Sequence, residues 1–182
     1  LAETKGFMPD DEGEALFRAA VDICRSPVEG PIVEIGSYCG RSTIWLGAAA
    51  QGAGRVVVTV DHHRGSEETQ EGWEHHDPEV MDQRINKMDT LPFLRRTLWD
   101  TELEDTVIAV VGASPRVATV WSSEIAMLFI DGGHGAEHAA ADYRSWAHHV
   151  AQGGVLAIHD VFADPADGGQ APHDEIYRPA LD

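Results

Sequence analysis

Residues 32–43 contain the most informative stretch of the chain, Ile32-Val33-Glu34-Ile35-Gly36-Ser37-Tyr38-Cys39-Gly40-Arg41-Ser42-Thr43. Its first four residues form a short apolar run with one acid, which is typical of a buried strand. Gly36 and Gly40 then bracket a tight turn, where missing side chains allow a ligand to approach the backbone. Residues 41–51 are helical in pattern and end before Gly52 and Gly54. This strand–turn–helix unit predicts an α/β fold with a binding site at the turn.

The same alternation of strand and helix continues through the chain. Apolar runs predict strands over 56–60, 107–111, 126–130 and 155–158, and helical patterns cover 10–24, 91–99, 117–121 and 137–150. Strands of this kind predict a doubly wound, mostly parallel, Rossmann-like sheet covered on both faces. We expect residues 1–182 to form a single domain, with the polar segment 62–87 as a lid-like insert and no strand after residue 164.

The charge, the apolar runs and the cysteine content of the chain exclude several classes of protein and of binding partner. The 182 residues include 13 basic and 31 acidic side chains, a net charge of −18 that repels phosphate backbones and anionic lipid. We therefore expect neither nucleic acid nor a membrane as partner. No apolar run approaches the ~18 residues of a membrane span, and no signal peptide is recognisable. Cys24 and Cys39 cannot form a disulfide framework, which fits a cytoplasmic protein.

Polar residues follow every predicted strand. In an open parallel sheet, ligands bind beyond the carboxyl ends of the strands, so these residues are expected to converge on one edge. The five ends are Glu34 to Ser37, Asp61, Gly112 to Ser114, Asp131 to His134, and His159-Asp160.

The first two strand ends indicate what kind of cofactor binds. The G-x-G-x-x-G fingerprint of nicotinamide binding is absent, because Tyr38 stands where the second glycine belongs, and no phosphate loop is present. Glu34 suits an amine, and Asp61 can accept both hydroxyls of a ribose. Together they favour a cationic nucleoside cofactor over a dinucleotide.

Residues 33–43 resemble the first motif of class I S-adenosylmethionine-dependent methyltransferases. Residues 129–134, 142–143, 153–155 and 159–160 resemble a narrower branch, the small metal-dependent O-methyltransferases related to macrolide-sugar and mannoside methylating enzymes. The resemblance covers roughly residues 7–162. Fuller members carry two more strands after the position of Asp182, so the resemblance implies either truncated C-terminal strands or an abbreviated fold.

The resemblance implies S-adenosyl-L-methionine as cofactor and assigns roles around it. Glu34 and Gly36 would hold the methionine end, Asp61 the ribose, and Ala113 with Ser114 the adenine edge. Ala113 departs from the acidic residue that is common in the family at this position. The remaining candidate cofactor-binding residues are Ser37, Tyr38, Gly40, Ser42 and Asp131.

The resemblance also implies a metal site and a base. Asp131, His159 and Asp160 occupy the ligand positions, and hard carboxylate oxygens favour Mg²⁺, with Mn²⁺ as the alternative. His134 matches the general base of the sugar-methylating relatives. Such a site would deprotonate an acceptor hydroxyl for methyl transfer. An alternative role remains open for each of these residues. Asp131 could cap a helix, Asp160 could accept from loop amides, His134 could be a loop residue, and His159 could lie behind the metal ligands.

The predicted function is therefore an O-methyltransferase that acts on a hydroxyl of a sugar or glycosylated metabolite. The expected partner is a small-molecule or oligosaccharide acceptor, with mannosides favoured. A nicotinamide oxidoreductase is the first alternative, disfavoured by Tyr38 and by the lack of a Tyr-x-x-x-Lys pair. A non-catalytic cofactor-binding module is the second. Tryptophans in helical stretches, Trp99 among them, are either core residues or contacts in a homodimer. The histidines and Trp73 within 62–76 suit either a sugar-binding lid or a solvated loop.

Overall fold

The computed structural model describes residues 3–66, 76–133 and 136–161. Within these ranges a five-stranded parallel sheet has the order β5-β2-β1-β6-β7, and a short antiparallel pair, β3 and β4, stands apart from it. The strands are β1 Ile32–Ile35, β2 Val57–Asp61, β3 Met81–Asp82, β4 Lys87–Met88, β5 Val107–Val111, β6 Ile125–Ile130 and β7 Val150–Ile158. The helices are α1 Asp10–Arg25, α2 Arg41–Ala53, α3 Leu91–Asp100, α4 Ser114–Ala118 and α5 Ala136–Trp146, with 3₁₀ turns η2 Pro78–Val80 and η3 Ala147–His149.

The strand order places β1 in the centre of the sheet. The chain first builds outward on one side through β2 and β5, and then returns to build β6 and β7 on the other side. The direction of winding reverses at β1, which is where ligands bind in doubly wound sheets. The predicted doubly wound, parallel α/β fold is confirmed.

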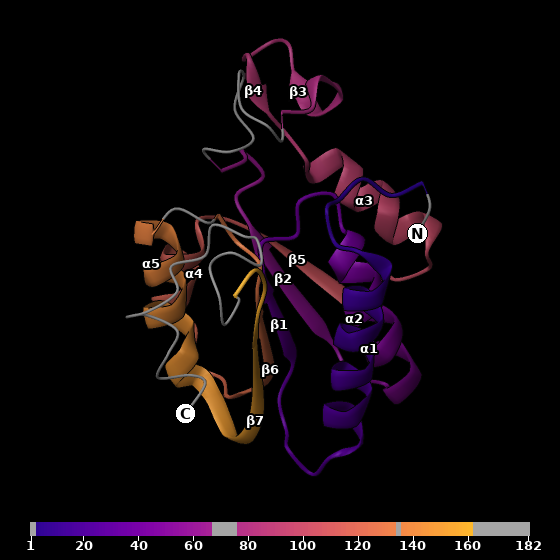
Figure 1. Ribbon diagram of the computed structural model, residues 1–182, viewed down its shortest axis with the longest axis vertical. Helices are drawn as coiled ribbons and strands as arrows, with labels where there is room; N and C mark the ends of the chain where they lie inside the picture. Colours follow the sequence, from indigo (N-terminus) through magenta and orange to yellow (C-terminus); the bar gives the residue numbers. More distant parts are fainter. Residues whose placement is uncertain (1–2, 67–75, 134–135, 162–182) are drawn as a thin grey trace.

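Successive residues of each strand pack into two separate cores. Ile32, Val57 and Met127 join the core beneath α1, α2 and α3, whereas Val33 and Leu128 join the core beneath α4 and α5. Figure 1 shows these two groups of helices on opposite faces of the sheet. Burial on both faces explains why the strands are apolar without alternation.

The bounds of three elements differ from the expectation by more than two residues. The helix expected over 117–121 is α4, which begins at Ser114, because Pro115 fits the first turn of a helix. The last strand begins at Val150 rather than at 155, and the preceding α-helix ends at Trp146. Gly153 has a φ of 79° inside β7, where the register against β6 shifts, so the glycines form a bulge within the strand and do not precede it.

The described part of segment 62–87 contains η2, β3 and the first residue of β4. Figure 1 shows this hairpin beyond the edge of the sheet at which the strands end. Val80 and Met88 are buried against Cys39 of the turn after β1, which anchors the hairpin to that turn. Residues 67–75, where Trp73 lies, fall outside the described residues, so the role of the segment as a lid remains a prediction.

Among the described residues, no helix combines the length and the apolar character needed to cross a bilayer.

Candidate active site

A ladder of backbone hydrogen bonds aligns the five strand ends on one edge. The amide of His159 donates to the carbonyl of Ile130, and the amide of Asp131 donates to that of Ile35. The amide of Gly36 donates to Val60, and that of Gly112 donates to the carbonyl of Asp61. Residues separated by more than 120 positions in sequence therefore lie along one rim of the sheet, as predicted.

The turn after β1 is held by the carboxylate of Asp61. Its Oδ2 accepts hydrogen bonds from the backbone amides of Ser37 at 3.0 Å and Tyr38 at 2.9 Å, and its Oδ1 accepts from the amide of His63 at 2.7 Å. Tyr38 has a φ of 47°, a left-handed conformation that is uncommon outside glycine. Each carboxylate oxygen retains acceptor capacity for a ligand hydroxyl.

Two glycines of the turn have different roles. Gly36 has a φ of 89°, and a Cβ there would lie 2.2 Å from the carbonyl oxygen of Asp131, so the turn and the end of β6 are in direct contact. Gly40 caps α2 with a φ of 96°, and its Cβ would lie 2.9 Å from a methyl group of Leu94. Gly40 therefore allows α3 to pack closely, while Gly36 brings together two parts of the predicted cofactor site.

Glu34 lies beneath this turn and is fully buried. Its two carboxylate oxygens accept hydrogen bonds from Ser42 Oγ at 2.6 Å and Thr43 Oγ1 at 2.7 Å. Burial raises the pKa of Glu34 to about 7, against the opposing effect of these hydroxyls, and the nearby Asp131 charge adds to the rise. In this arrangement Glu34 and Ser42 tie the start of α2 to β1. Their direct contact with a cofactor remains a prediction.

Ser37 is 2% exposed, and its hydroxyl has no hydrogen-bond partner among the described residues. A buried hydroxyl without a partner is uncommon in native proteins and needs an explanation. Its position next to the amides that Asp61 holds makes it a suitable donor or acceptor for a bound polar ligand.

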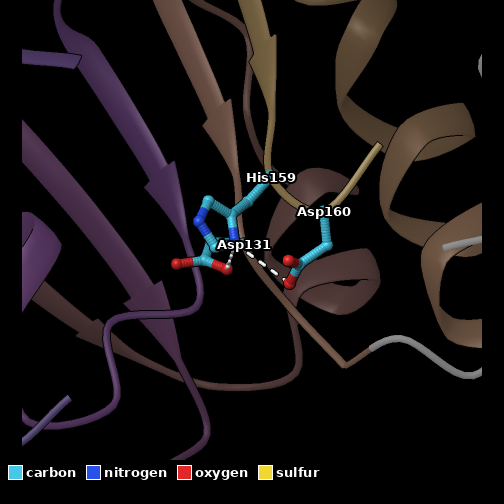
Figure 2. Close-up of side chains that lie close together, drawn as sticks. All are labelled: Asp131, His159 and Asp160. Carbon is cyan, nitrogen blue, oxygen red and sulfur yellow. Dashed lines mark hydrogen bonds and ion pairs between the residues drawn. The ribbon is translucent and has the colours of Figure 1, made fainter. Parts of the chain in front are cut away.

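The three predicted metal ligands lie together at the ends of β6 and β7 (Figure 2). His159 Nδ1 is 3.2 Å from Asp131 Oδ1 and 3.0 Å from Asp160 Oδ2. One ligand atom from each residue lies within 4.8 Å of the others, a separation that a single cation can bridge. Burial alone would lower the pKa of His159, but the two carboxylates outweigh it and raise the pKa to about 11. The predicted juxtaposition is thus present.

Sequence reasoning missed a fourth member of this cluster, Glu12 of α1. Its Oε2 accepts a hydrogen bond from His159 Nε2 at 2.7 Å, across 147 residues of sequence. In the sequence Glu12 belongs to an acidic first turn, which the helix dipole explains by itself. No sequence signal distinguishes it from its neighbours.

The predicted adenine edge, Ala113 and Ser114, follows β5. Ala113 is exposed, whereas Ser114 is buried and its Oγ donates a hydrogen bond to Asp142 Oδ1 of α5. Burial raises the pKa of Asp142, with Ser114 opposing the rise. A Cβ on Gly132 would lie 2.6 Å from the other oxygen of Asp142. Asp142 therefore joins the ends of β5 and β6, a role that the sequence did not reveal.

The predicted base, His134, lies outside the described residues. It follows Asp131 by three residues, and its role remains a prediction.

Comparison with known proteins identifies the family. The sequence pattern of the methyltransferase domain family matches residues 33–161, which include both the turn after β1 and the cluster at β6 and β7.

Solved structures of methyltransferases share the fold. The O-methyltransferase NovP is 21% identical with a TM-score of 0.66, covering 84% of this chain and 66% of NovP. The SAH-bound Podospora anserina methyltransferase PaMTH1 is 18% identical with a TM-score of 0.63, covering 96% and 64%. An O-methyltransferase from Bacillus cereus in complex with SAH is 18% identical with a TM-score of 0.56, covering 82% and 56%.

This chain thus spans 56–66% of the length of these three proteins. Their likeness supports the Rossmann-like fold, and the family match supports the resemblance drawn from residues 33–43. The chain belongs to the methyltransferase domain family.

Proposed function

We propose that this protein transfers the methyl group of S-adenosyl-L-methionine to a hydroxyl oxygen, with the help of a divalent cation. The observation that carries the proposal is the single rim on which the Gly36 turn, Asp61 and the Asp131–His159–Asp160 cluster meet. A cofactor-binding turn and a cation-binding cluster side by side fit one reaction centre.

The residues at the turn fit the cofactor. Asp61 lies at the end of β2 with spare acceptor capacity for ribose hydroxyls, and Ser37 has a buried hydroxyl without a partner among the described residues. The contact between Gly36 and the Asp131 carbonyl leaves no room for a side chain, so the backbone itself forms this part of the site. The strongly acidic chain, at −18, also favours a cationic sulfonium.

The cluster at β6 and β7 fits a divalent cation. Asp131 and Asp160 supply hard oxygen donors, which suit Mg²⁺ and Mn²⁺, and His159 adds a softer nitrogen that favours Mn²⁺. His159 Nδ1, which faces both carboxylates, would be its donor atom. A cation bound there would lower the pKa of an acceptor hydroxyl and hold it in position.

The chain's own groups supply the rest of the chemistry. The carbon–sulfur bond of the sulfonium breaks as the acceptor oxygen forms a new bond to the methyl carbon, and S-adenosylhomocysteine leaves. The proton of the acceptor hydroxyl passes to His134, which we propose as the general base. Because the displacement is in line, alignment by the rim residues supplies much of the acceleration.

We infer a sugar hydroxyl, on a free saccharide or a glycosylated metabolite, as acceptor. The resemblance of residues 129–134 and 159–160 to sugar-methylating enzymes supports this. The β3–β4 hairpin, which follows a polar stretch of sequence and packs against Cys39 of the turn after β1, supports it as well. A mannoside is our first choice within that class.

Two experiments test the proposal. Calorimetric titration with S-adenosylhomocysteine and, separately, with NAD should show binding of the former alone; the reverse would favour an oxidoreductase. A screen of saccharides and hydroxylated glycosides with methyl donor and Mn²⁺ or Mg²⁺, read by product mass, should give a product 14 mass units heavier that chelation abolishes.

Variants of the cluster sharpen the second experiment. Asp131→Asn and Asp160→Asn should each lower turnover at least 100-fold, an order of magnitude typical for groups acting on the reacting centre. The matched control, Asp105→Asn, removes an exposed acid just before β5, on the opposite edge, and should leave turnover unchanged. Full turnover after exhaustive chelation would refute metal dependence, and full turnover of His134→Ala would refute the assigned base.

A further inference from the structure

We infer that Glu12 is a positioning residue for the cation site: its carboxylate holds the imidazole of His159 by Nε2, so that Nδ1 faces Asp131 and Asp160. This inference rests on the proposed cation site and adds a member that lies outside it in sequence. The juxtaposition that carries it is the 2.7 Å hydrogen bond from His159 Nε2 to Glu12 Oε2.

The two ring nitrogens of His159 have separate partners. Nδ1 lies 3.0–3.2 Å from the carboxylates of Asp160 and Asp131, on the side where a cation would bind. Nε2 points away from them to Glu12. A neutral imidazole carries its hydrogen on one nitrogen, and the hydrogen bond made by that nitrogen decides which one remains free to bind a metal. A cation would replace the hydrogen that Nδ1 directs at the two carboxylates, and the hydrogen on Nε2 would remain donated to Glu12.

Glu12 can perform this role because α1 is fixed on both sides of it. Asp10 Oδ1 accepts a hydrogen bond at 2.8 Å from Arg41, whose Nε also donates to the carbonyl of Met8 at 2.7 Å. Gly13 is so close to the indole of Trp45 that a Cβ there would lie 2.0 Å from Nε1. The first turn of α1 is therefore anchored to α2, and Glu12 is carried to a defined place.

The ring of His159 is also held from the side. The ring of Phe129 meets it edge-on with centroids 6.2 Å apart, and the His159 side chain is 16% exposed. Apart from the contacts with Asp131 and Asp160, the polar contact that fixes the orientation of the ring within the described part of the chain is the hydrogen bond from Nε2 to Glu12. Carboxylates that orient metal-binding histidines in this way commonly alter metal affinity by 10–100-fold when they are replaced.

Mn²⁺ binding by the full chain, measured by the loss of the free-ion EPR signal, tests the inference without any activity assay. Glu12→Ala should weaken binding 10–100-fold, while Glu12→Gln, whose amide oxygen can still accept from Nε2, should retain most of the affinity. Glu14→Gln is the matched control, because Glu14 is an exposed acid of the same helix that pairs with Arg18. It should bind Mn²⁺ like the unsubstituted chain.

Pulsed EPR of the Mn²⁺-loaded chain adds a readout that a purely structural role would not move. The unsubstituted chain should show ¹⁴N coupling from a directly bound imidazole, and Glu12→Ala should lose it at saturating Mn²⁺. Equal affinities for Glu12→Ala and the unsubstituted chain would overturn the inference, as would equal losses in Glu12→Ala and Glu12→Gln. If the unsubstituted chain itself binds no Mn²⁺, the proposed cation site fails, and the inference fails with it.

Discussion

The buried carboxylate of Glu34 gives a prediction that can be worked through quantitatively, because it concerns folding and needs no ligand. Glu34 is fully buried, and burial raises its pKa from a usual 4.5 to about 7. Between these two values the unfolded chain has released the proton while the folded chain still holds it. Stability therefore falls as pH rises through this window, and the loss is complete above the folded-state pKa.

Replacement of Glu34 by Gln removes this pH-dependent contribution to the free energy of unfolding while keeping the shape of the side chain. Each pH unit within the window costs about 1.36 kcal/mol, so over the roughly 1.5 units from pH 5.5 to 7 the unsubstituted chain should lose about 2 kcal/mol relative to Glu34→Gln. Above pH 8 the difference in the free energy of unfolding between the two chains should no longer change with pH. The lower limit of pH 5.5 avoids the isoelectric point near 4.7.

Urea denaturation at pH 5.5, 6.5, 7.5 and 8.5, followed by circular dichroism, measures the effect as a difference between two chains, so that other titrating groups cancel. Glu14→Gln, an exposed acid on α1, serves as control and should give a difference independent of pH. A constant difference between Glu34→Gln and the unsubstituted chain over the whole range would refute the reasoning, since it would mean that Glu34 folds with an ordinary pKa.

Four further substitutions test the turn and its supports. In urea denaturation, Gly36→Ala should lower the free energy of unfolding by about 2 kcal/mol or more, because its φ is 89° and a Cβ would collide with Asp131. Gly52→Ala, with open space around it in α2, should raise the free energy of unfolding by about 0.5–1 kcal/mol. Similar values for the two substitutions would contradict this reasoning. Asp61→Ala leaves three backbone amides without their acceptor, so it should weaken the binding of S-adenosylhomocysteine at least tenfold, as measured by calorimetry. An affinity equal to that of the unsubstituted chain would contradict this prediction. Arg41→Ala should expose the N-terminal segment to limited proteolysis, because Arg41 bonds the backbone there; unchanged cleavage would show that other contacts hold it.

Much of the fold could be predicted because the strands of the five-stranded sheet are built around apolar runs bounded by glycine or by a polar residue, whereas the short β3–β4 pair carries no such pattern. That pattern reports burial on both faces, and together with the intervening helices it indicates a covered parallel sheet. The exceptions were local. Gly153 and Gly154 were expected to separate helix from strand, yet they form a bulge inside β7, because a glycine pair has the same appearance in sequence whether it breaks a strand or bends one.

The candidate site could be predicted to the same extent and for a related reason. Residues at the carboxyl ends of the strands, such as Asp61, Asp131 and His159, had to meet at one rim once the sheet was parallel. The side chains that bind to these rim residues from the helices are not placed by the strand order. Glu12 reaches His159 from α1, and Asp142 reaches Ser114 from α5, through helix positions that the strand pattern does not restrict.

The amino-acid sequence alone therefore determined the class of fold and the rim where the polar strand ends gather, since these follow from local hydrophobic pattern and from the geometry of parallel strands. The family followed from the resemblance of residues 33–43 to a known motif, which the family match supports. Tertiary packing decided how each polar group is paired. It buried Glu34 beneath the turn with two hydroxyls of α2, and it brought Glu12 to the far side of the His159 ring. Such pairings depend on where helices lie against the sheet, and helix placement is set by the whole core.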